Sequence, residues 1–489
     1  MDLGFLQELK GKTTYRSLAD AIAKSVDCGT LAKGEKLPSA RELALFTECS
    51  RATVVHAFDE LTARGYLHSI KGDATYISRT LAQAASHDDN SMTSKPAQNF
   101  NWSNKYTDLS QQLLLQKPDF VTSGDFKQLN YGALASELLP LRQWRKILAE
   151  HCNSESPFAL EDRQDVFGYR PLRQAIADLL RRSKGMHCSA DQIVLYSSSQ
   201  SALAHLMQLL VKPGDTAICE EPGYSVAREQ FRSHEAEVKS IAVDEHGLNV
   251  KKVRDTIDRA DWIYVTPSCQ DPTGAILSES RRIELLNWAQ SRGAAIIEDG
   301  WDSDFHYGGP VIPTLQSMDT QGCVIYAQTF WRLLFPLVST AFLVVPEKLI
   351  PLFRNSKHIA DHQYPLVEHY VLTEFIKDGD FENHIRSSWK VLRERRQAMI
   401  FALKLAFSEK IQILSPGAAM HLMVRFDQSW SQAEIAHAAE SAGLPLASSA
   451  SYYSGNAHGN EFLAPFAALS AEQIAVATKL FAAKLLAKQ

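Results

Sequence analysis

Three serines and a glutamine follow a short apolar run at residues 193–196 and precede a helical apolar pattern. The first turn of a helix has unpaired backbone N–H groups that favour anions, and hydroxyl groups supply further hydrogen-bond donors. Ser198, Ser199 and Gln200 are therefore candidate ligands of an anionic group. A simpler alternative is that a serine at this position only caps the helix.

A tyrosine and an aspartate follow two other apolar runs. Tyr224 comes directly after Glu221-Pro222-Gly223, and its ring is able to stack on a flat aromatic ligand. Asp299 follows the apolar run at residues 294–298, where a buried carboxylate is costly without a partner. The alternative for Tyr224 is a side chain packed in the core after a turn.

A second group of polar side chains lies near the N-terminus, around a turn between two expected helices. Arg41 lies in the first helix, and Ser50, Arg51, Thr53 and His56 lie at the start of the second. In a helix-turn-helix this part of the second helix enters the major groove of DNA. Arginine there binds guanine through two hydrogen bonds or grips a phosphate. Each side chain alone is also explained as a solvated helix residue, and the set is the stronger signal.

Lys71 and Gly72 lie in a hairpin expected between two short strands at residues 66–70 and 74–78. At that position a lysine side chain and a glycine backbone reach a neighbouring phosphate or the minor groove. Residues 13–79 contain nine basic and eight acidic side chains, which leaves a net charge of only +1. Binding to DNA therefore requires a focused patch and a dimer.

The bulk composition restricts the kind of protein. The 489 residues carry a net charge of −5, so a DNA-binding surface must be local. The seven cysteines are scattered and never spaced as Cys-x-x-Cys, which predicts a cytoplasmic protein with no disulfides and no zinc site. The N-terminus lacks a secretory signal pattern. The longest apolar stretch, residues 333–346, is interrupted by Pro336 and is typical of a buried strand, not of a membrane span.

The pattern of elements predicts two folded parts. Ser39 and Glu42 have the spacing of a capping box before a helix. Farther along, strand-like runs alternate with helical patterns, which predicts a mostly parallel sheet covered on both faces. The expected strands are residues 193–196, 216–219, 263–266, 294–298, 323–327 and 341–345. The expected domains are residues 1–80, a polar linker at 81–106, a large domain at 107–375 and a small C-terminal α/β lobe at 376–489.

Residues 37–44, 50–54 and 65–67 closely resemble the GntR-type winged helix-turn-helix, over about residues 12–79. The resemblance implies an α+β fold that binds a double-stranded DNA operator. The implied DNA contacts are Arg41, Ser50, Arg51, Thr53 and Gly72. The wing reads Gly72-Asp73-Ala74-Thr75, where such families usually have Gly-Ser-Gly-Thr. Asp73 puts a negative charge near phosphate, which weakens the expected wing contact.

Residues from about 107 to 486 resemble the fold-type I aminotransferases, which use pyridoxal 5'-phosphate. The resemblance rests on residues 197–200, 221–224, 266–274, 296–305 and 326–336. It implies an α/β fold in which Asp299 pairs with the pyridine nitrogen, Tyr224 stacks on the ring and residues 198–200 hold the phosphate. The cofactor-binding set by position is Ser198, Ser199, Gln200, Tyr224, Asp271, Asp299, Trp301, Thr329 and Arg332. With the N-terminal part, the chain resembles the MocR class of regulators.

Several positions depart from the enzyme pattern. Arg332 stands where these enzymes have the lysine that forms the Schiff base, and residues 253–347 contain no lysine. Arginine keeps its proton far above neutral pH and is not the neutral amine that this chemistry needs. Ser339 replaces an arginine that neutralises the phosphate, and Leu463 stands near the position of an arginine that binds the substrate carboxylate. Asp271, Trp301 and Trp331 replace an asparagine, a tyrosine and a serine.

One interpretation accounts for these features, and two alternatives stay open. The chain is interpreted as a DNA-binding transcription regulator whose aminotransferase-like domain senses a small molecule without turnover. Pyridoxal phosphate is expected to bind non-covalently or to be absent, and amino-acid-like or anionic effectors are further candidates. No catalytic residue, metal site or membrane partner is assigned. The alternatives are a working aminotransferase with an accessory DNA domain and a non-catalytic scaffold. The resemblance also implies a homodimer through the aminotransferase-like domains.

Overall fold

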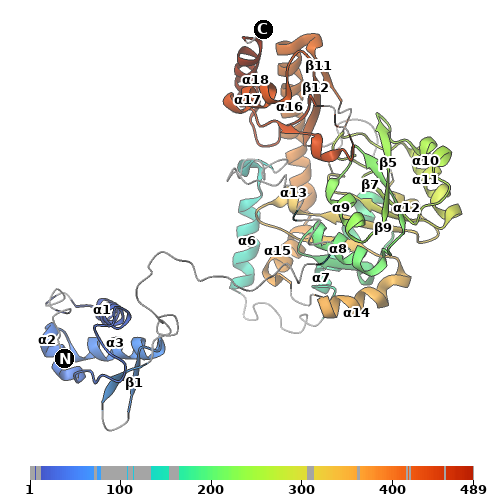
Figure 1. Cartoon of the computed structure of the whole chain (residues 1–489). Coiled ribbons are helices and arrows are strands. Elements are labelled where there is room, and N and C mark those ends of the chain that lie inside the picture. The colour runs from blue at the N-terminus through green and yellow to red at the C-terminus, as the bar shows by residue number, and fades with distance from the viewer. Residues whose placement is uncertain are drawn as a thin grey trace. The chain divides into compact units, whose positions relative to one another are not determined.

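The structure, a computed structural model, describes residues 6, 11, 13–70, 74–78, 107, 114, 134–153, 165–304, 313–360, 364–414, 417, 420–455, 457 and 459–487. The chain divides into two compact units, residues 1–107 and 108–489 (Figure 1). Lys71, Gly72 and the predicted linker at residues 81–106 lie outside the described residues. The four predicted domain limits therefore stay predictions.

The described residues of the first unit form three α-helices and a two-stranded hairpin. Helices α1 (Tyr15–Asp27), α2 (Ala40–Thr47) and α3 (Arg51–Ala63) precede strands β1 (Leu67–Ser69) and β2 (Thr75–Ile77), which pair antiparallel. Apolar side chains at helical spacing form its core, among them Leu18, Ile22, Leu43, Val54 and Leu61. The predicted helix-turn-helix with a following hairpin is confirmed.

Helix α2 begins where the capping-box pattern predicts. The Glu42 backbone N–H donates to Ser39 Oγ at 3.3 Å, and the Ser39 N–H donates to Glu42 Oε2 at 2.8 Å. These bonds satisfy two N–H groups that lack partners within the helix. The helix ends at Glu48, whose backbone is left-handed with φ of 55°. The turn that joins α2 to α3 is therefore fixed at both ends, by Glu48 and by the cap residue Ser50.

The second unit is built on an eight-stranded sheet with the order β3-β10-β9-β8-β7-β4-β5-β6. Its strands are β3 (Ile193–Tyr196), β4 (Thr216–Glu221), β5 (Glu237–Asp244), β6 (Gly247–Leu248), β7 (Trp262–Val265), β8 (Ala295–Asp299), β9 (Val324–Thr329) and β10 (Ala341–Val344). The five central strands β9, β8, β7, β4 and β5 run parallel, and β10 runs antiparallel to both β3 and β9. The predicted mostly parallel sheet is confirmed. Burial on both faces explains the unbroken apolar runs of its central strands.

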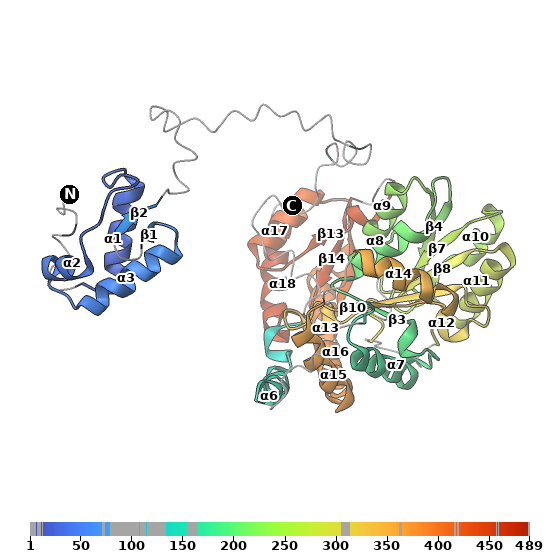
Figure 2. The same cartoon turned by 90° about the horizontal axis from the view of Figure 1, so that it is seen from below.

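Helices cover both faces of this sheet (Figure 1 and Figure 2). One face packs against α8 (Ser199–Leu210), α9 (Ser225–Ser233) and α14 (Ile350–Ala360). The other face packs against α7 (Arg170–Lys184) and α15 (Leu366–Lys377) near β3, and against α10 (Val250–Thr256), α11 (Glu279–Arg292) and α12 (Leu315–Met318) near β7 and β8. The arrangement leaves the ends of the strands, and not their faces, open for a site.

A smaller sheet with the order β11-β12-β14-β13 forms the C-terminal lobe. Its strands are β11 (Ile411–Ile413), β12 (His421–Phe426), β13 (Ala447–Ser448) and β14 (Glu461–Pro465). The helices here and beside α15 are α6 (Leu141–Cys152), α13 (Trp331–Leu334), α16 (Asp380–Phe407), α17 (Gln432–Ser441) and α18 (Ala471–Leu486). Short 3₁₀ helices lie at Ser136–Leu138, Ala190–Gln192, Glu347–Leu349, Ser408–Lys410 and Ala450–Tyr452. One apolar core runs from α7 and α15 through α16 into this lobe.

Two details differ from the prediction. Residues 333–346 are not one buried strand, because the stretch contains the end of α13, a bend at Pro336 and then β10. Strand β5 was not predicted, because Glu237 and Lys239 interrupt its apolar pattern near the edge of the sheet. None of the described helices combines the length and the apolar content needed to span a lipid bilayer.

The capping box predicts a local effect of one substitution. We expect Ser39→Ala to lower the stability of α2 by about 1 kcal/mol, because Glu42 loses the acceptor of its N–H. Hydrogen exchange of the full chain, read by mass spectrometry, should speed up in peptides covering α2. The matched change Ser470→Ala removes the capping box of α18 in the other unit and should leave exchange in α2 unchanged. Equal exchange in Ser39→Ala and the parent protein would contradict the role of the cap.

Candidate functional site

Four strand ends of the large sheet meet at one edge and carry most of the predicted pocket residues. Tyr224 follows β4, Asp271 follows β7, Asp299 ends β8 and Arg332 follows β9. Because these strands are parallel, the residues after their carboxyl ends come together. The charges of Asp299, Asp271 and Arg332 all affect one another or Tyr224. The structure therefore brings these four side chains into one cluster.

Asp299 is buried at the end of β8 and is held by hydrogen bonds. The hydroxyl of Tyr264, on the neighbouring strand β7, donates to Asp299 Oδ2 at 2.6 Å. Burial raises the pKa of Asp299 to about 6, and the hydrogen bonds from Tyr264 and the Trp301 backbone oppose that rise. The ring of Tyr224 lies next to that of Tyr264, with centroids 6.3 Å apart and planes 26° apart. A carboxylate beside two aromatic rings suits a flat ligand with a protonated nitrogen.

Arg332 lies in the short helix α13 and is buried against the end of β8. Its guanidinium carbon is 4.3 Å from the centroid of the Trp301 ring, a cation–π contact. Its Nε lies 3.7 Å from Asp302 Oδ1, and the exposed fractions of the two side chains are 9% and 1%. A guanidinium does not lose its proton, so its burial requires such compensation. Arg332 is therefore held by partners from the protein itself.

Trp301 is held in turn by neighbouring loops. Its indole Nε1 donates to the Cys269 carbonyl at 2.8 Å. Its ring stacks with that of His421, with centroids 6.2 Å apart and planes 27° apart. Burial lowers the pKa of His421 to about 3, and His421 Nε2 lies 2.8 Å from the Pro272 carbonyl. The imidazole is therefore neutral and donates from Nε2. These bonds fix the orientation of the indole beneath Arg332.

Asp271 adds a buried carboxyl group in which one oxygen lacks a hydrogen bond. Its side chain is buried, and its Oδ1 accepts no hydrogen bond within the described part of the chain. Burial raises the pKa of Asp271 to about 8, which Arg332 opposes and the charges of Asp299 and Asp302 increase. Burial also raises the pKa of Asp302 to about 6. The cluster thus contains three buried aspartates and one guanidinium, an excess of acid over base.

Ser198 caps the helix that the sequence predicts to bind an anion. Its side-chain oxygen accepts from the Ser201 N–H at 3.0 Å, as the simpler alternative expects. Ser199 is the first residue of α8, and the side-chain amide of Gln200 donates to the Tyr224 hydroxyl at 3.4 Å. Gln200 therefore joins this helix to the pocket. An anion at this end would be bound by backbone N–H groups, because the Ser198 oxygen serves the cap.

Near Thr329, the carboxylate of Glu368 lies beside Ser339, the position at which the sequence resemblance predicts an arginine in the enzymes. Glu368 Oε1 accepts from the backbone N–H groups of Ser339 and Thr340, at 3.1 and 2.9 Å. Thr329 Oγ1 accepts from the Trp331 N–H at 3.1 Å and faces the Thr340 carbonyl at 3.5 Å. Position 339 therefore lies next to negative charge, which disfavours a phosphate dianion there.

Three contributors to the pocket were missed from the sequence. Tyr264 is the partner of Asp299, Asp302 is the partner of Arg332, and Glu368 binds Ser339. Tyr264 lies inside the predicted strand at residues 263–266, and nothing in that apolar run marks it as the partner of Asp299. Asp302 directly follows Trp301, but its type alone gives it no role. Glu368 lies 29 residues from Ser339 in the chain, and nothing in the sequence indicates that contact.

The predicted DNA contacts lie around the start of α3 in the first unit. Arg41 is the second residue of α2, and Arg41, Arg51 and His56 are exposed. The Ser50 hydroxyl caps α3 by accepting from the Thr53 N–H at 3.1 Å and lies 2.8 Å from the Thr53 hydroxyl. The two arginines are thus presented on either side of the turn. Their contact with DNA stays a prediction.

Two family models match the chain. The model described as bacterial regulatory proteins, gntR family, matches residues 14–77. The model described as aminotransferase class I and II matches residues 129–453. The chain belongs to the aminotransferase class I and II family. It carries a gntR-type helix-turn-helix domain at its N-terminus, so the predicted fusion of these two domains is confirmed.

Several relatives align over most of the chain. A Bacillus subtilis protein named as an uncharacterized HTH-type transcriptional regulator, YhdI, is 29% identical over 91% of this chain and 90% of its own length. The probable rhizopine catabolism regulatory protein MocR of Rhizobium meliloti is 29% identical over 88% of this chain and 85% of its own length. The HTH-type pyridoxine biosynthesis transcriptional regulator PdxR of Corynebacterium glutamicum is 26% identical over 78% of this chain and 76% of its own length.

Solved aminotransferases share the fold of the second unit. The multiple substrate aminotransferase of Thermococcus profundus aligns with a TM-score of 0.70 and 23% identity, over 80% of this chain and 99% of that chain. An archaeal alanine:glyoxylate aminotransferase aligns with a TM-score of 0.72 and 22% identity, over 80% of this chain and 100% of that chain. At this identity the likeness establishes the fold alone.

The raised pKa of Asp271 predicts how stability depends on pH. Between its ordinary value of 3.8 and about 8, the folded chain keeps a proton that the unfolded chain has lost. Stability therefore falls as pH rises through this window. Asn at this position does not titrate, so Asp271→Asn should flatten the dependence and stabilise the chain at pH 8 by on the order of a few kcal/mol.

Urea unfolding of the full chain at pH 5 and pH 8 measures this difference. The exposed aspartate Asp258 supplies the matched control, since Asp258→Asn should leave the pH dependence as it is. The interpretation is wrong if Asp271→Asn and the parent protein lose the same stability between the two pH values.

Proposed function

We propose that this protein is a DNA-binding transcription regulator whose aminotransferase-like unit binds a small effector without turning it over. The observation that carries the proposal is the buried guanidinium of Arg332, stacked on Trp301 and paired with Asp302. We assign Arg332 to the position of the catalytic lysine on the sequence resemblance. A permanently protonated group at this position is not a nucleophile toward an aldehyde. The working-enzyme alternative therefore lacks its central group.

Pyridoxal phosphate fits this pocket at one end only. Asp299 and the rings of Tyr224 and Tyr264 suit a protonated pyridine. The other end is unsuitable, because Arg332 does not form a Schiff base and Glu368 binds the backbone at position 339. The cofactor of the family, held through a lysine and a phosphate-binding arginine, therefore does not fit the residues present. No chemical step through it is assigned.

The effector proposed here has a chemistry set by the buried carboxylates. Asp271 Oδ1 has no hydrogen-bond partner among the described residues, so a cationic donor beside it favours the ionised carboxylate over the protonated form, and Asp299 favours a protonated nitrogen between aromatic rings. Arg332 is already paired with Asp302, which leaves less of its charge for an incoming anion. Of the expected effector classes, an amino-acid-like molecule with an ammonium group or a protonated nitrogen ring is thus favoured over a simple anion.

DNA binding is supported by the first unit and by the relatives. The gntR-family match covers the helices that carry the exposed Arg41 and Arg51, and the three relatives described above carry regulator names. The near balance of nine basic and eight acidic side chains in residues 13–79 gives one copy little electrostatic affinity. We therefore assign the chain to a homodimer, joined through the aminotransferase-like units, that reads two half-sites.

The DNA contact is tested by one arginine and a matched control. Arg51→Ala should weaken binding to the DNA upstream of the protein's own gene by about 1–3 kcal/mol. Arg64 lies at the other end of α3, where it binds Asp20 at 3.0 Å, so Arg64→Ala should bind DNA nearly as the parent does. Fluorescence anisotropy at fixed salt gives the affinities. Equal losses in the two variants would remove the assignment of Arg51.

The absence of turnover is tested with pyridoxal phosphate. We expect no aldimine absorption band from the mixture and no borohydride-stable adduct in the pocket, because Arg332 offers no free amine. Peptide mass spectrometry distinguishes pocket adducts from adducts of surface lysines. Arg332→Lys supplies an amine at the same position and should give a trapped adduct on Lys at millimolar cofactor. An adduct inside the pocket of the unchanged protein, or turnover of an amino donor, would defeat the proposal.

A further inference from the structure

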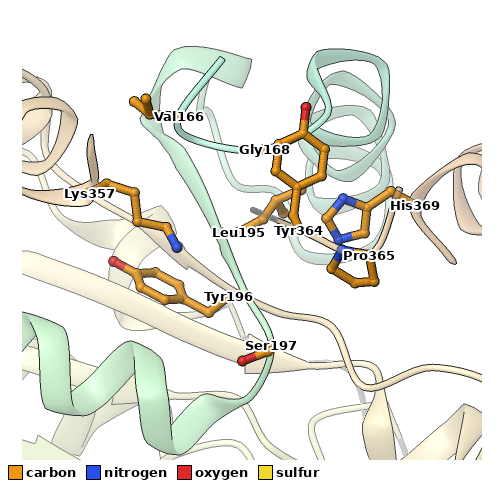
Figure 3. Close-up of a pocket in the computed structure, with 9 residues that line it drawn as sticks. All are labelled: Val166, Gly168, Leu195, Tyr196, Ser197, Lys357, Tyr364, Pro365 and His369. Atoms are coloured by element: carbon orange, nitrogen blue, oxygen red, sulfur yellow. The ribbon is translucent and has the colours of Figure 1, made fainter. Parts of the chain in front are cut away.

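A small cavity lies at the edge of the large sheet, apart from the Arg332 cluster. It is lined by residues of β3, of the segment before α7, of α14 and of the start of α15, and Lys357 and His369 lie on opposite sides of β3 in Figure 3. Figure 3 shows Lys357 beside the ring of Tyr196, and His369 next to Tyr364 and Pro365. The cavity volume is about 20 Å³, which exceeds the ~10–15 Å³ needed to hold one water molecule. One water-sized particle fits, and a phosphate group does not.

His369 is the lining side chain whose buried polar atoms indicate a bound ligand. Its exposed fraction is 1%, and neither ring nitrogen has a hydrogen-bond partner among the described residues. Its ring stacks on that of Tyr364 with planes 12° apart, and this stacking contact gives neither ring nitrogen a hydrogen bond. A neutral imidazole always has one N–H donor, and leaving a buried donor unpaired costs about 1–3 kcal/mol. A buried polar atom of this kind is explained by a bound water or ion.

The charge around the cavity indicates whether a water molecule or an ion binds there. Lys357 is 4% exposed and its ammonium lies 4.5 Å from the centroid of the Tyr196 ring. Burial and the charge of Lys357 lower the pKa of His369 to about 3, so the imidazole is neutral and the potential at its ring is positive. An N–H donor beside a buried cation favours a negative particle over water.

We propose that this cavity binds one monatomic anion, a halide such as chloride, between the N–H of His369 and the ammonium of Lys357. The size of the cavity sets the class of ligand, and the donor and the cation set its sign. The site lies at the carboxyl end of β3, and Ser197 at its margin directly precedes the Ser198 cap of α8. An anion here therefore stabilises the end of β3, which leads directly into α8. Gln200 of α8 in turn contacts Tyr224.

Crystals of the full chain soaked in sodium bromide provide the direct test. Bromide is expected to give an anomalous peak in the cavity within hydrogen-bond distance of His369 and near Lys357. Density for a water molecule without an anomalous peak, or a cavity filled by a side chain of the protein, would overturn the proposal.

A solution measurement uses the same ligand class. Sodium chloride, compared with sodium gluconate at equal ionic strength, should raise the Tm of the full chain by a few degrees in a saturable manner. Lys357→Met and His369→Leu should abolish the saturable rise, whereas Lys348→Met, a change at a lysine of a neighbouring 3₁₀ helix, should keep it. A parent protein with equal Tm in both salts at every concentration would contradict chloride binding, whatever the variants do.

Discussion

The buried guanidinium of Arg332 is the constraint on which the rest of the pocket depends. A lysine at this position is able to release its proton, but an arginine keeps its charge and must be compensated wherever it is buried. The compensation comes from Trp301 and Asp302, two adjacent residues at the end of β8. At position 301, where the resemblance to the enzymes predicts a tyrosine, the indole of Trp301 presents a larger aromatic face to a cation. Arg332, Trp301 and Asp302 are thus one consistent set, and each would be costly without the others.

The fold was predictable from the sequence because its signals are local. Central strands buried on both faces appear as unbroken apolar runs, and Ser39 with Glu42 marks the start of a helix within four residues. Strand β5 was not predicted, because it lies near the sheet edge, where charged residues such as Glu237 and Lys239 are tolerated. The break at Pro336 divided an apolar stretch that composition alone treats as continuous.

The site was predictable only in part. Residues that follow parallel strands, such as Asp299 and Arg332, were expected to come together, and the structure brings them together. Their partners were not expected, because Tyr264 and Asp299 are 35 residues apart and Ser339 and Glu368 are 29 apart. Pairing over such separations depends on strand order, which no single segment of the sequence contains.

Unsatisfied buried atoms distinguish the two proposed sites more sharply than their shapes do. In the Arg332 cluster the guanidinium lies against Asp302, and among the described residues the carboxyl oxygens Asp271 Oδ1 and Asp302 Oδ1 have no hydrogen-bond partner. The edge cavity contains the ammonium of Lys357 and the imidazole of His369. The N–H of that imidazole is a donor, and neither ring nitrogen has a hydrogen-bond partner among the described residues. A ligand that donates satisfies the first site, and a ligand that accepts satisfies the second. Since one small particle cannot do both, the two sites call for different ligands, and occupancy of one is no measure of occupancy of the other.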